Sequence, residues 1–242
     1  MPSEPPAPTR LLPPPPFTRL LVTCEHAGNE VPAAYADLFA DARTELDSHR
    51  GWDPGALGVA LRLAVRRSAP LLATTTTRLL VEANRSPDNP GLFSARTRAL
   101  PQAERARILD RFYYPHRRGV EQLVRDWADN DQRVLHVAVH TFTDVLDGQT
   151  RHLDVGLLFD PRRHAEADLC AQWRAGLEAA CGLRVRDNQP YLGTDDGLTT
   201  HLRSVFPEAA YAGVEVEIRQ GLLALPENQV GVGDLLAEAL PG

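Results

Sequence analysis

The 242-residue sequence contains no lysine, because all 26 of its basic residues are arginines. This absence excludes mechanisms that need a lysine amine, such as a Schiff base, a pyridoxal-phosphate anchor or a P-loop lysine. The formal net charge of −6 argues against a general nucleic-acid-binding protein, which would carry a basic surface. Any substrate carboxylate must therefore be bound by arginine or by neutral polar groups.

Cysteines and long apolar runs are also scarce. The three cysteines are widely spaced without a CxxC or zinc-finger pattern, so free buried thiols are expected. No apolar run approaches the ~18 residues that span a membrane, and residues 1–16 lack the features of a secretory signal. We expect a cytoplasmic protein with a flexible proline-rich tail (1–16), a single domain (17–242), and neither membrane nor nucleic acid as a partner.

Apolar strand-like runs alternate with helical patterns along the chain. Strands are expected at 18–24, 70–77, 78–81, 133–140, 155–159 and 213–219, and helices at 54–67, 101–128 (interrupted near Pro115) and 161–180. This alternation predicts an α/β fold, a central sheet with helices on both faces. In such sheets, polar residues just beyond the carboxyl ends of strands tend to form the site.

Two histidines stand at predicted strand ends. His26 follows the first strand in a glycine-bearing turn, and His140 ends the strand at 133–140, on the same face as His136. His26 is either a solvent-exposed loop histidine or a metal ligand, His136 fits a hydrogen-bonded core histidine, and His140 is better placed for chemistry. His49 lies in a polar segment and has no obvious structural role.

Carboxylates and an arginine gather in similar positions. Asp53 precedes the proline that starts a predicted helix, so it is either an N-cap or a functional residue. Arg85 follows a strand, where it is either a surface residue or a clamp for a carboxylate. Glu215 and Glu217 share one face of the strand at 213–219, which is either an edge strand with a solvent-exposed face or a wall of a catalytic cleft.

Taken together, these residues predict metal-dependent hydrolysis. Zinc in hydrolytic sites takes two or three His, Asp or Glu ligands and leaves a position for water, whose pKa it lowers. A separate carboxylate can accept the proton of that water, and an arginine can position the substrate. The alternatives are an inactive protein that binds a small carboxylate, and another metallohydrolase such as a metallophosphatase, for which paired carboxylate clusters are not evident.

Several longer stretches resemble those of the N-formylglutamate amidohydrolases, in particular a branch that carries the motif CEHAGN-x-VP. The matching stretches are CEHAGNEVP (24–32), HRGWDPGAL (49–57), NRSP (84–87), YYPHR (113–117), HTFT (140–143), DVGLLFDP (154–161), 186–197 and 214–220. The resemblance implies a mixed central sheet between helices, similar to zinc-dependent exopeptidases of the phosphorylase/hydrolase-like fold. It also implies hydrolysis of an N-acyl bond, as of N-formyl-L-glutamate to formate and glutamate.

The resemblance further implies a ligand set for one zinc ion. His26 and His140 match the family's early and late histidines, and Asp53 stands where the better-known branch has a histidine. We therefore expect His26, Asp53 and His140 as ligands, with Glu30 as the rival of Asp53.

Other roles follow from the same resemblance. Asn84 and Arg85 resemble a pair that holds a terminal carboxylate, and Arg219 or Arg186 would hold a second carboxylate if the substrate has one. Glu217 is the expected general base, with Glu215 as its rival. His49 and His116 are possible additional site residues.

The chain departs from the better-known branch at two motifs. Glu25 stands before His26 where that branch has proline, and Ala138 stands two residues before His140 where it has aspartate. Glu25 could orient His26 as its hydrogen-bond partner. Because of these departures, the acyl group and the amine product need not be formyl and glutamate.

Overall fold

The computed structural model describes residues 16–241, so the tail predicted for 1–16 lies, apart from Pro16, outside the described residues. The strands are β1 (Arg19–Cys24), β2 (Leu71–Ala73), β3 (Val134–Phe142), β4 (Val145–Leu146), β5 (Gln149–Thr150), β6 (Val155–Leu158), β7 (Val185–Asp187) and β8 (Tyr211–Arg219). The α-helices are α1 (Arg43–Leu46), α2 (Ala56–Arg66), α3 (Gln102–Ile108), α4 (Tyr114–Ala128), α5 (His164–Cys181), α6 (Leu198–Val205) and α7 (Pro226–Ala239). Two 3-10 helices, η1 (Ala33–Phe39) and η3 (Gln220–Leu222), and a π-helical turn, η2 (Leu109–Tyr113), complete the list.

Six strands form one central sheet in the order β2-β1-β3-β8-β6-β7, and β4 and β5 form a separate hairpin. All neighbouring pairs in the sheet are parallel except β6 and β8, which are antiparallel. The prediction of a single α/β domain with a mixed sheet is therefore confirmed. No helix in the range 16–241 is both long and apolar enough to cross a membrane.

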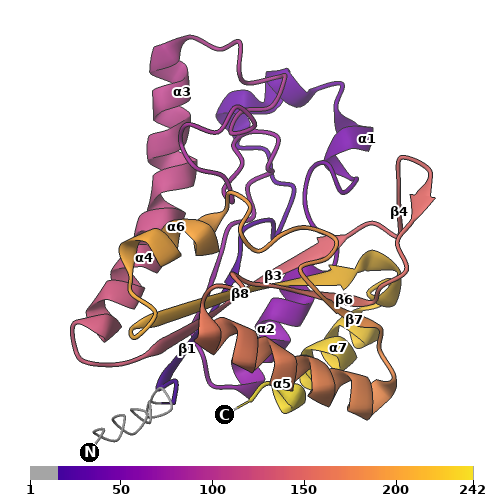
Figure 1. Cartoon of the computed structure of the whole chain (residues 1–242). Coiled ribbons are helices and arrows are strands. Elements are labelled where there is room, and N and C mark those ends of the chain that lie inside the picture. Colours follow the sequence, from indigo (N-terminus) through magenta and orange to yellow (C-terminus); the bar gives the residue numbers. More distant parts are fainter. Residues whose placement is uncertain (1–15, 242) are drawn as a thin grey trace, which may run out of the picture.

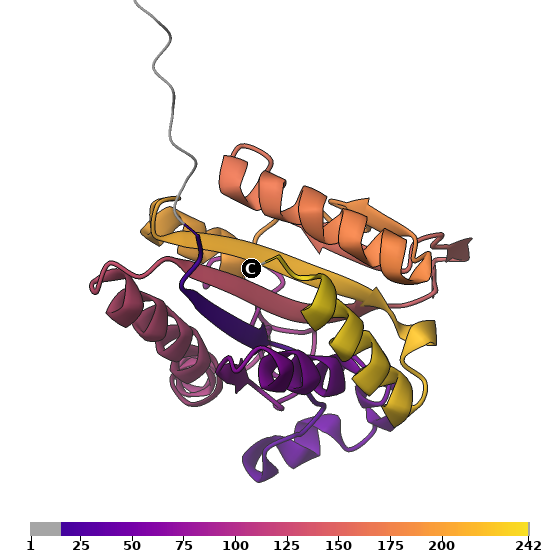
Figure 2. The ribbon, with the colours of Figure 1, turned by 90° about the horizontal axis from the view of Figure 1, so that it is seen from below.

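Helices cover both faces of this sheet (Figure 1). On one face α2, α5 and α7 bury the largest apolar cluster, which includes Trp173 of α5 and alternate residues of β3 and β8 such as Val137 and Val216. Figure 2 shows these three helices from below. On the other face α4 and α6 pack a smaller cluster around Leu21 and Tyr211. Because side chains alternate along a strand, the polar residues of β3 and β8 point toward this second face.

A third apolar cluster lies beyond the carboxyl ends of the central strands, and it corrects one prediction. Residues 78–81 were expected to form a strand, but they form a turn whose Leu80 packs with Phe39 and Ile108 from η1 and α3. The apolar run is explained by burial in this cluster instead of by sheet pairing. The neighbouring strand is also shorter than expected, because only Leu71–Ala73 pairs with β1.

The fold also decides two alternatives that the sequence leaves open. β8 lies between β3 and β6, so the edge-strand interpretation of Glu215 and Glu217 is wrong. The N-cap residue of α2 is Gly55, with a positive φ of 85°, and no side chain caps this helix. The N-cap interpretation of Asp53 is therefore wrong too, and its buried carboxylate needs another explanation.

Candidate functional site

The candidate site lies where β1, β3 and β8 end, beneath the third apolar cluster. His26 lies two residues after the end of β1, and His140 lies two residues before the end of β3. In the parallel ladder between β3 and β8, His140 is the direct neighbour of Glu217, and Ala138 is the neighbour of Glu215. Register partners point to the same face, so the ladder places His140 and Glu217 side by side above the sheet.

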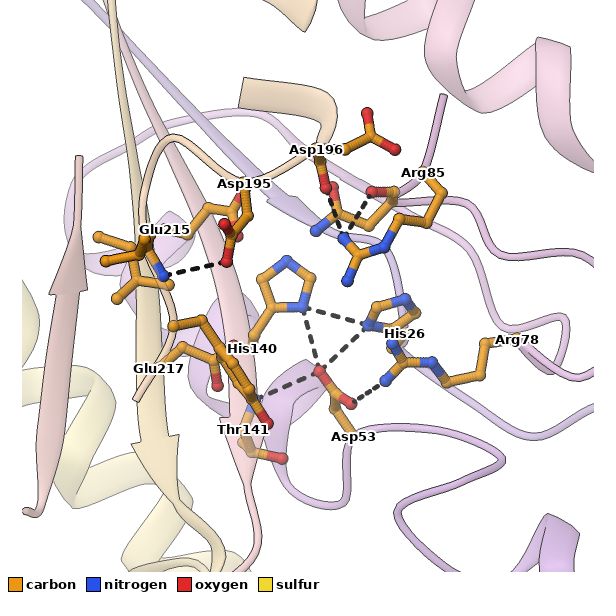
Figure 3. A pocket seen from close by; sticks show the side chains of 14 residues that line it. His26, Asp53, Arg78, Arg85, His140, Thr141, Asp195, Asp196, Glu215 and Glu217 are labelled. Carbon is orange, nitrogen blue, oxygen red and sulfur yellow. Dashed lines mark hydrogen bonds and ion pairs between the residues drawn. The ribbon is translucent and has the colours of Figure 1, made fainter. Parts of the chain in front are cut away.

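Three buried donor atoms converge at this point, as Figure 3 shows. The Nδ1 atoms of His26 and His140 are 3.2 Å apart, and Asp53 Oδ2 lies 3.2 Å from the first and 3.1 Å from the second. All three residues are at most 3% exposed. The backbone N–H of Thr141 also donates to Asp53 Oδ2 at 3.3 Å, which holds the carboxylate toward the two rings.

The geometry of this triangle fits a single metal ion. With metal–ligand bonds of about 2.0–2.1 Å, donor atoms at tetrahedral angles lie about 3.3–3.4 Å apart, close to the three separations of 3.1–3.2 Å. A hydrogen-bond explanation is less complete, because two Nδ1 atoms and one oxygen converge and each ring nitrogen carries at most one proton. Two imidazoles and a carboxylate are also a donor set that zinc accepts.

A buried glutamate contacts the Nε2 atom of each of the two histidines in the triangle. His26 Nε2 is in close contact with Glu82 Oε1, and His140 Nε2 lies 3.0 Å from Glu25 Oε2. A carboxylate on the outer nitrogen fixes the tautomer that leaves Nδ1 available as a ligand, and it increases the basicity of the ring. Glu25 therefore contacts His140 and not the adjacent His26; its other oxygen lies 3.2 Å from His116 Nε2.

Electrostatics at the triangle favour added positive charge. Burial alone would lower the pKa of His140, but Asp53 and Glu25 outweigh it and raise this pKa well above the ordinary value. Burial would likewise raise the pKa of Asp53, but the two histidines and Arg78 hold it far below its usual range. The field that stabilises protons on the rings would equally stabilise a divalent cation bound by them.

Arg78 forms ion pairs with two of the carboxylates around the triangle. Its Nη1 donates to Asp53 Oδ1 at 3.1 Å, and its Nε donates to Glu82 Oε2 at 2.7 Å. Glu82 in turn accepts the backbone N–H of Asn84 at 3.1 Å. Arg78 is thus paired with two carboxylates and links the partner of His26 to the third donor of the triangle.

Glu217 lies beside the triangle and has a raised pKa. It is 6% exposed, and its Oε2 atom has no hydrogen-bond partner among residues 16–241. Burial raises its pKa to about 7, with help from the negative charges of Asp53 and Glu215. A carboxylate with such a pKa can exchange a proton near neutral pH, as a general base must. Glu215, two residues earlier on β8, accepts a hydrogen bond from Thr199 Oγ1 at 2.7 Å.

These side chains line a pocket of about 180 Å³. Asn84 and Arg85 form one side of it, and Tyr191, Leu192 and Asp195 of the loop before α6 lie at its rim. Arg85 Nη1 donates to the backbone carbonyls of Asn84 and Asp196, and no carboxylate of the described chain pairs with this guanidinium. The second half of the 186–197 stretch, one of those that carry the family resemblance, therefore reaches the site.

Other sequence-predicted site residues lie elsewhere. His49 is exposed, and Glu30 is exposed and accepts a hydrogen bond from Thr75 Oγ1. Arg186 is exposed near Glu178, and Arg219 pairs with Asp144 and Asp154. None of these four lines the pocket, and the three-donor group contains Asp53 and not Glu30.

Three further histidines are accounted for. His116 approaches the site only through Glu25. His136 has the predicted hydrogen-bonded core role, with Thr23 Oγ1 and Tyr211 Oη each 2.8 Å from a ring nitrogen, and burial lowers its pKa to about 4. His201 lies 2.9 Å from Glu121, away from the pocket.

Arg78 and Glu82 were not among the predicted site residues. Both lie in or next to the segment that was predicted as a strand, and neither belongs to a motif with a known spacing. The available signal was chemical: a charged residue at each end of an apolar three-residue stretch (79–81), since charged side chains next to buried apolar residues need partners.

Comparisons with known proteins show the family and the fold of this chain. The model of the family described as N-formylglutamate amidohydrolase matches residues 18–224. A gene product of Agrobacterium tumefaciens has a similar structure, with a TM-score of 0.79 and 31% identity over 91% of this chain and 90% of that chain. An N-formylglutamate amidohydrolase from Ralstonia eutropha shares the fold, with a TM-score of 0.65 and 18% identity over 95% of this chain and 93% of that chain. No sequence among curated proteins matches. The extent of the family match shows that the chain belongs to the N-formylglutamate amidohydrolase family, whose members are hydrolases acting on linear amides.

Proposed function

We propose that the protein is a zinc-dependent amidohydrolase that cleaves the N-acyl bond of a small N-acyl amino acid, with N-formyl as the reference acyl group. The observation that carries this proposal is the convergence of His26 Nδ1, His140 Nδ1 and Asp53 Oδ2 beside the unpartnered oxygen of Glu217. Family membership supports the reaction class. The cytoplasmic location expected from the sequence stays a prediction.

His26, Asp53 and His140 would hold the metal. A divalent ion in this place supplies Lewis-acid polarisation of the acyl carbonyl and lowers the pKa of water. Glu82 and Glu25 keep the two rings oriented through their Nε2 atoms. Burial alone would favour the neutral forms of Asp53 and Glu82; the two histidines and then Arg78 keep Asp53 ionised, and Arg78 together with His26 keeps Glu82 ionised.

Glu217 is the proposed general base. Its carboxylate accepts a proton from the attacking water while the water oxygen forms a bond to the acyl carbon. It then donates this proton to the amine nitrogen as the C–N bond breaks, so the products are a carboxylic acid and a free amino acid. Arg85 and Asn84 bind the substrate's α-carboxylate. Arg85 is available because it has no ion-pair partner among the described residues. The side-chain oxygen of Asn84 already accepts the backbone N–H of Leu198, so the side-chain N–H groups of Asn84 are left for a ligand.

The proposal is tested by metal analysis combined with a hydrolysis screen over N-formyl, N-acetyl and longer N-acyl amino acids. We expect one zinc per chain, released carboxylic acid, and loss of both in the Asp53→Asn variant. His201→Asn is the matched control, because it alters a polar side chain outside the pocket.

The screen also separates the alternatives. Tight binding of an N-acyl amino acid by the zinc-loaded protein without product would favour the inactive carboxylate-binding protein. A metallophosphatase finds little support, since residues 16–241 contain one group of metal-ligand side chains and not the paired clusters of a two-metal site.

A further inference from the structure

The pocket next to the metal-ligand triangle has few positive charges free to bind a substrate. Within the described chain, its lining includes two arginines, Arg78 and Arg85. Arg78 already contacts two carboxylates, Asp53 and Glu82. Arg85 donates to backbone carbonyls and forms no ion pair with a carboxylate of the described chain. Arg85 can therefore form an ion pair with one substrate carboxylate, but the described pocket lining offers no second unpaired arginine for another carboxylate.

The opposite wall of the pocket is negative. Glu215 lines this wall, and its Oε1 accepts a hydrogen bond from Thr199 Oγ1 at 2.7 Å. Glu217 also lines the pocket, is more than nine-tenths buried, and carries the unpartnered Oε2 described above. Asp195 adds a carboxylate at the rim, where its Oδ2 accepts the backbone N–H of Leu192 at 3.1 Å, and Asp196 accepts from Ser86 N–H and Asn89 Nδ2. Glu217 is reserved for proton transfer, so Glu215 and Asp195 are the carboxylates that a substrate side chain would meet.

The two arginines that could have bound a second carboxylate are used elsewhere. Arg219 Nη1 donates to Asp144 Oδ1 at 2.9 Å, and its Nη2 lies 3.1 Å from Asp154 Oδ1. Arg186 donates to the backbone carbonyl of Val185 and lies near Glu178. Neither side chain lines the pocket.

We propose that this pocket selects N-acyl amino acids with one carboxylate and a cationic side chain, such as N-acyl derivatives of arginine or lysine, over N-acyl glutamate. This inference rests on the proposed function for the position of the scissile bond. Arg85 and Asn84 bind the α-carboxylate, the acyl group lies at the metal-ligand triangle, and the side chain meets Glu215. At an effective dielectric constant of about 20, a like charge about 6 Å from Glu215 disfavours binding by tenfold or more.

A comparison of kcat/KM for three N-formyl amino acids tests the preference. N-formyl-L-glutamine is nearly isosteric with N-formyl-L-glutamate, so their ratio isolates the side-chain charge. We expect glutamine to exceed glutamate at least tenfold, and N-formyl-L-arginine to exceed both. In Glu215→Gln the advantage of arginine over glutamate falls at least tenfold. In the matched control Glu178→Gln, a glutamate outside the pocket, the ratio is unchanged.

Calorimetric binding of the free amino acids to the zinc-loaded protein tests the same preference without catalysis. We expect L-arginine to bind more tightly than L-glutamine, and L-glutamine more tightly than L-glutamate. Equal or tighter binding of glutamate, or faster hydrolysis of N-formyl-L-glutamate than of its glutamine analogue, would overturn the inference and leave the proposed function intact. Preferred binding of arginine with no hydrolysis of any N-acyl derivative would support the pocket's selectivity and overturn the proposed function.

Discussion

Replacing Glu217 by glutamine separates the roles of charge and shape at the proposed base. The substitution keeps the size of the side chain and the neighbours of β8 but removes the group that accepts a proton. A positioned general base contributes about 10²- to 10⁴-fold to the rate, so we expect kcat to fall by at least 100-fold while one zinc per chain is retained. Glu215→Gln, the same change one pleat away, should cost about tenfold or less for a neutral substrate.

The same variant has a stability signature that follows from the raised pKa. Folding shifts the pKa of Glu217 from 4.5 to about 7, so the folded state holds its proton more tightly than the unfolded state. The stability that this proton provides is present below pH 4.5 and is lost as the pH rises through about 7. At about 1.4 kcal/mol per pH unit, the ionised wild type is less stable at pH 8.5 than a neutral counterpart by about 3 kcal/mol.

Denaturation of the metal-free proteins in a chelator measures this difference directly. We expect Glu217→Gln to match wild type near pH 4.5 and to exceed it by about 3 kcal/mol at pH 8.5. Activity of the wild type should decline as the pH falls below the pKa of Glu217, and a bound cation moves this decline to lower pH. Undiminished hydrolysis by Glu217→Gln would refute its role as the base, and a pH-independent stability difference would refute the raised pKa.

Four other predictions follow. Removing the metal with a chelator should lower Tm by about 5–10 °C relative to protein with zinc at 100 times its Kd, and a Tm that zinc does not change would contradict the metal site. Glu25→Gln and Glu82→Gln should each weaken zinc binding about 10- to 100-fold in a chelator competition; wild-type affinity in either variant would remove that glutamate from the ligand support. Arg85→Ala should lower kcat/KM about 10- to 100-fold, mainly through KM, whereas a fall confined to kcat would point to a different role. Glu166→Ala should destabilise by about 3–5 kcal/mol, because this fully buried carboxylate accepts the backbone N–H groups of Asp160 and Gly213 and pairs with Arg203; the exposed Glu178→Ala on the same helix is its control, and equal unfolding energies would contradict the reasoning.

The strands and the residues at their ends could be predicted because both follow local rules. Apolar alternation locates β1, β3 and β8 to within two residues. Once these strands are taken as parallel, their carboxyl ends meet at one edge of the sheet, which brings His26, His140 and Glu217 to one place. The period of two then assigns Glu217 to the face of His140 without any knowledge of the helices.

Arg78 and Glu82 could not be predicted in the same way, because distant contacts determine their turn. The backbone N–H of Arg78 donates to Gly51, and that of Glu82 donates to Leu92. A run of leucine and valine between them indicates a strand by local preference, and only burial against η1 and α3 favours a turn. The prediction that Arg219 holds a substrate carboxylate failed for a related reason. It alternates with Glu217, but Asp144 and Asp154, which bind it, come from segments around the β4–β5 hairpin whose position depends on the antiparallel placement of β6.

Glu25 and Ala138, the two departures from the better-known branch, lie in different parts of the site. Glu25 contacts His140 and His116 and does not line the pocket, so in the proposed site it would affect how a metal is held and not which substrates enter. Ala138, in contrast, is the ladder neighbour of Glu215 and points to the same face. An aspartate at this position, as in the better-known branch, would stand next to Glu215 across the ladder and repel it. With alanine at position 138, Glu215 of β8 has no carboxylate beside it on β3. The proposed preference for a cationic side chain requires this negative charge of Glu215.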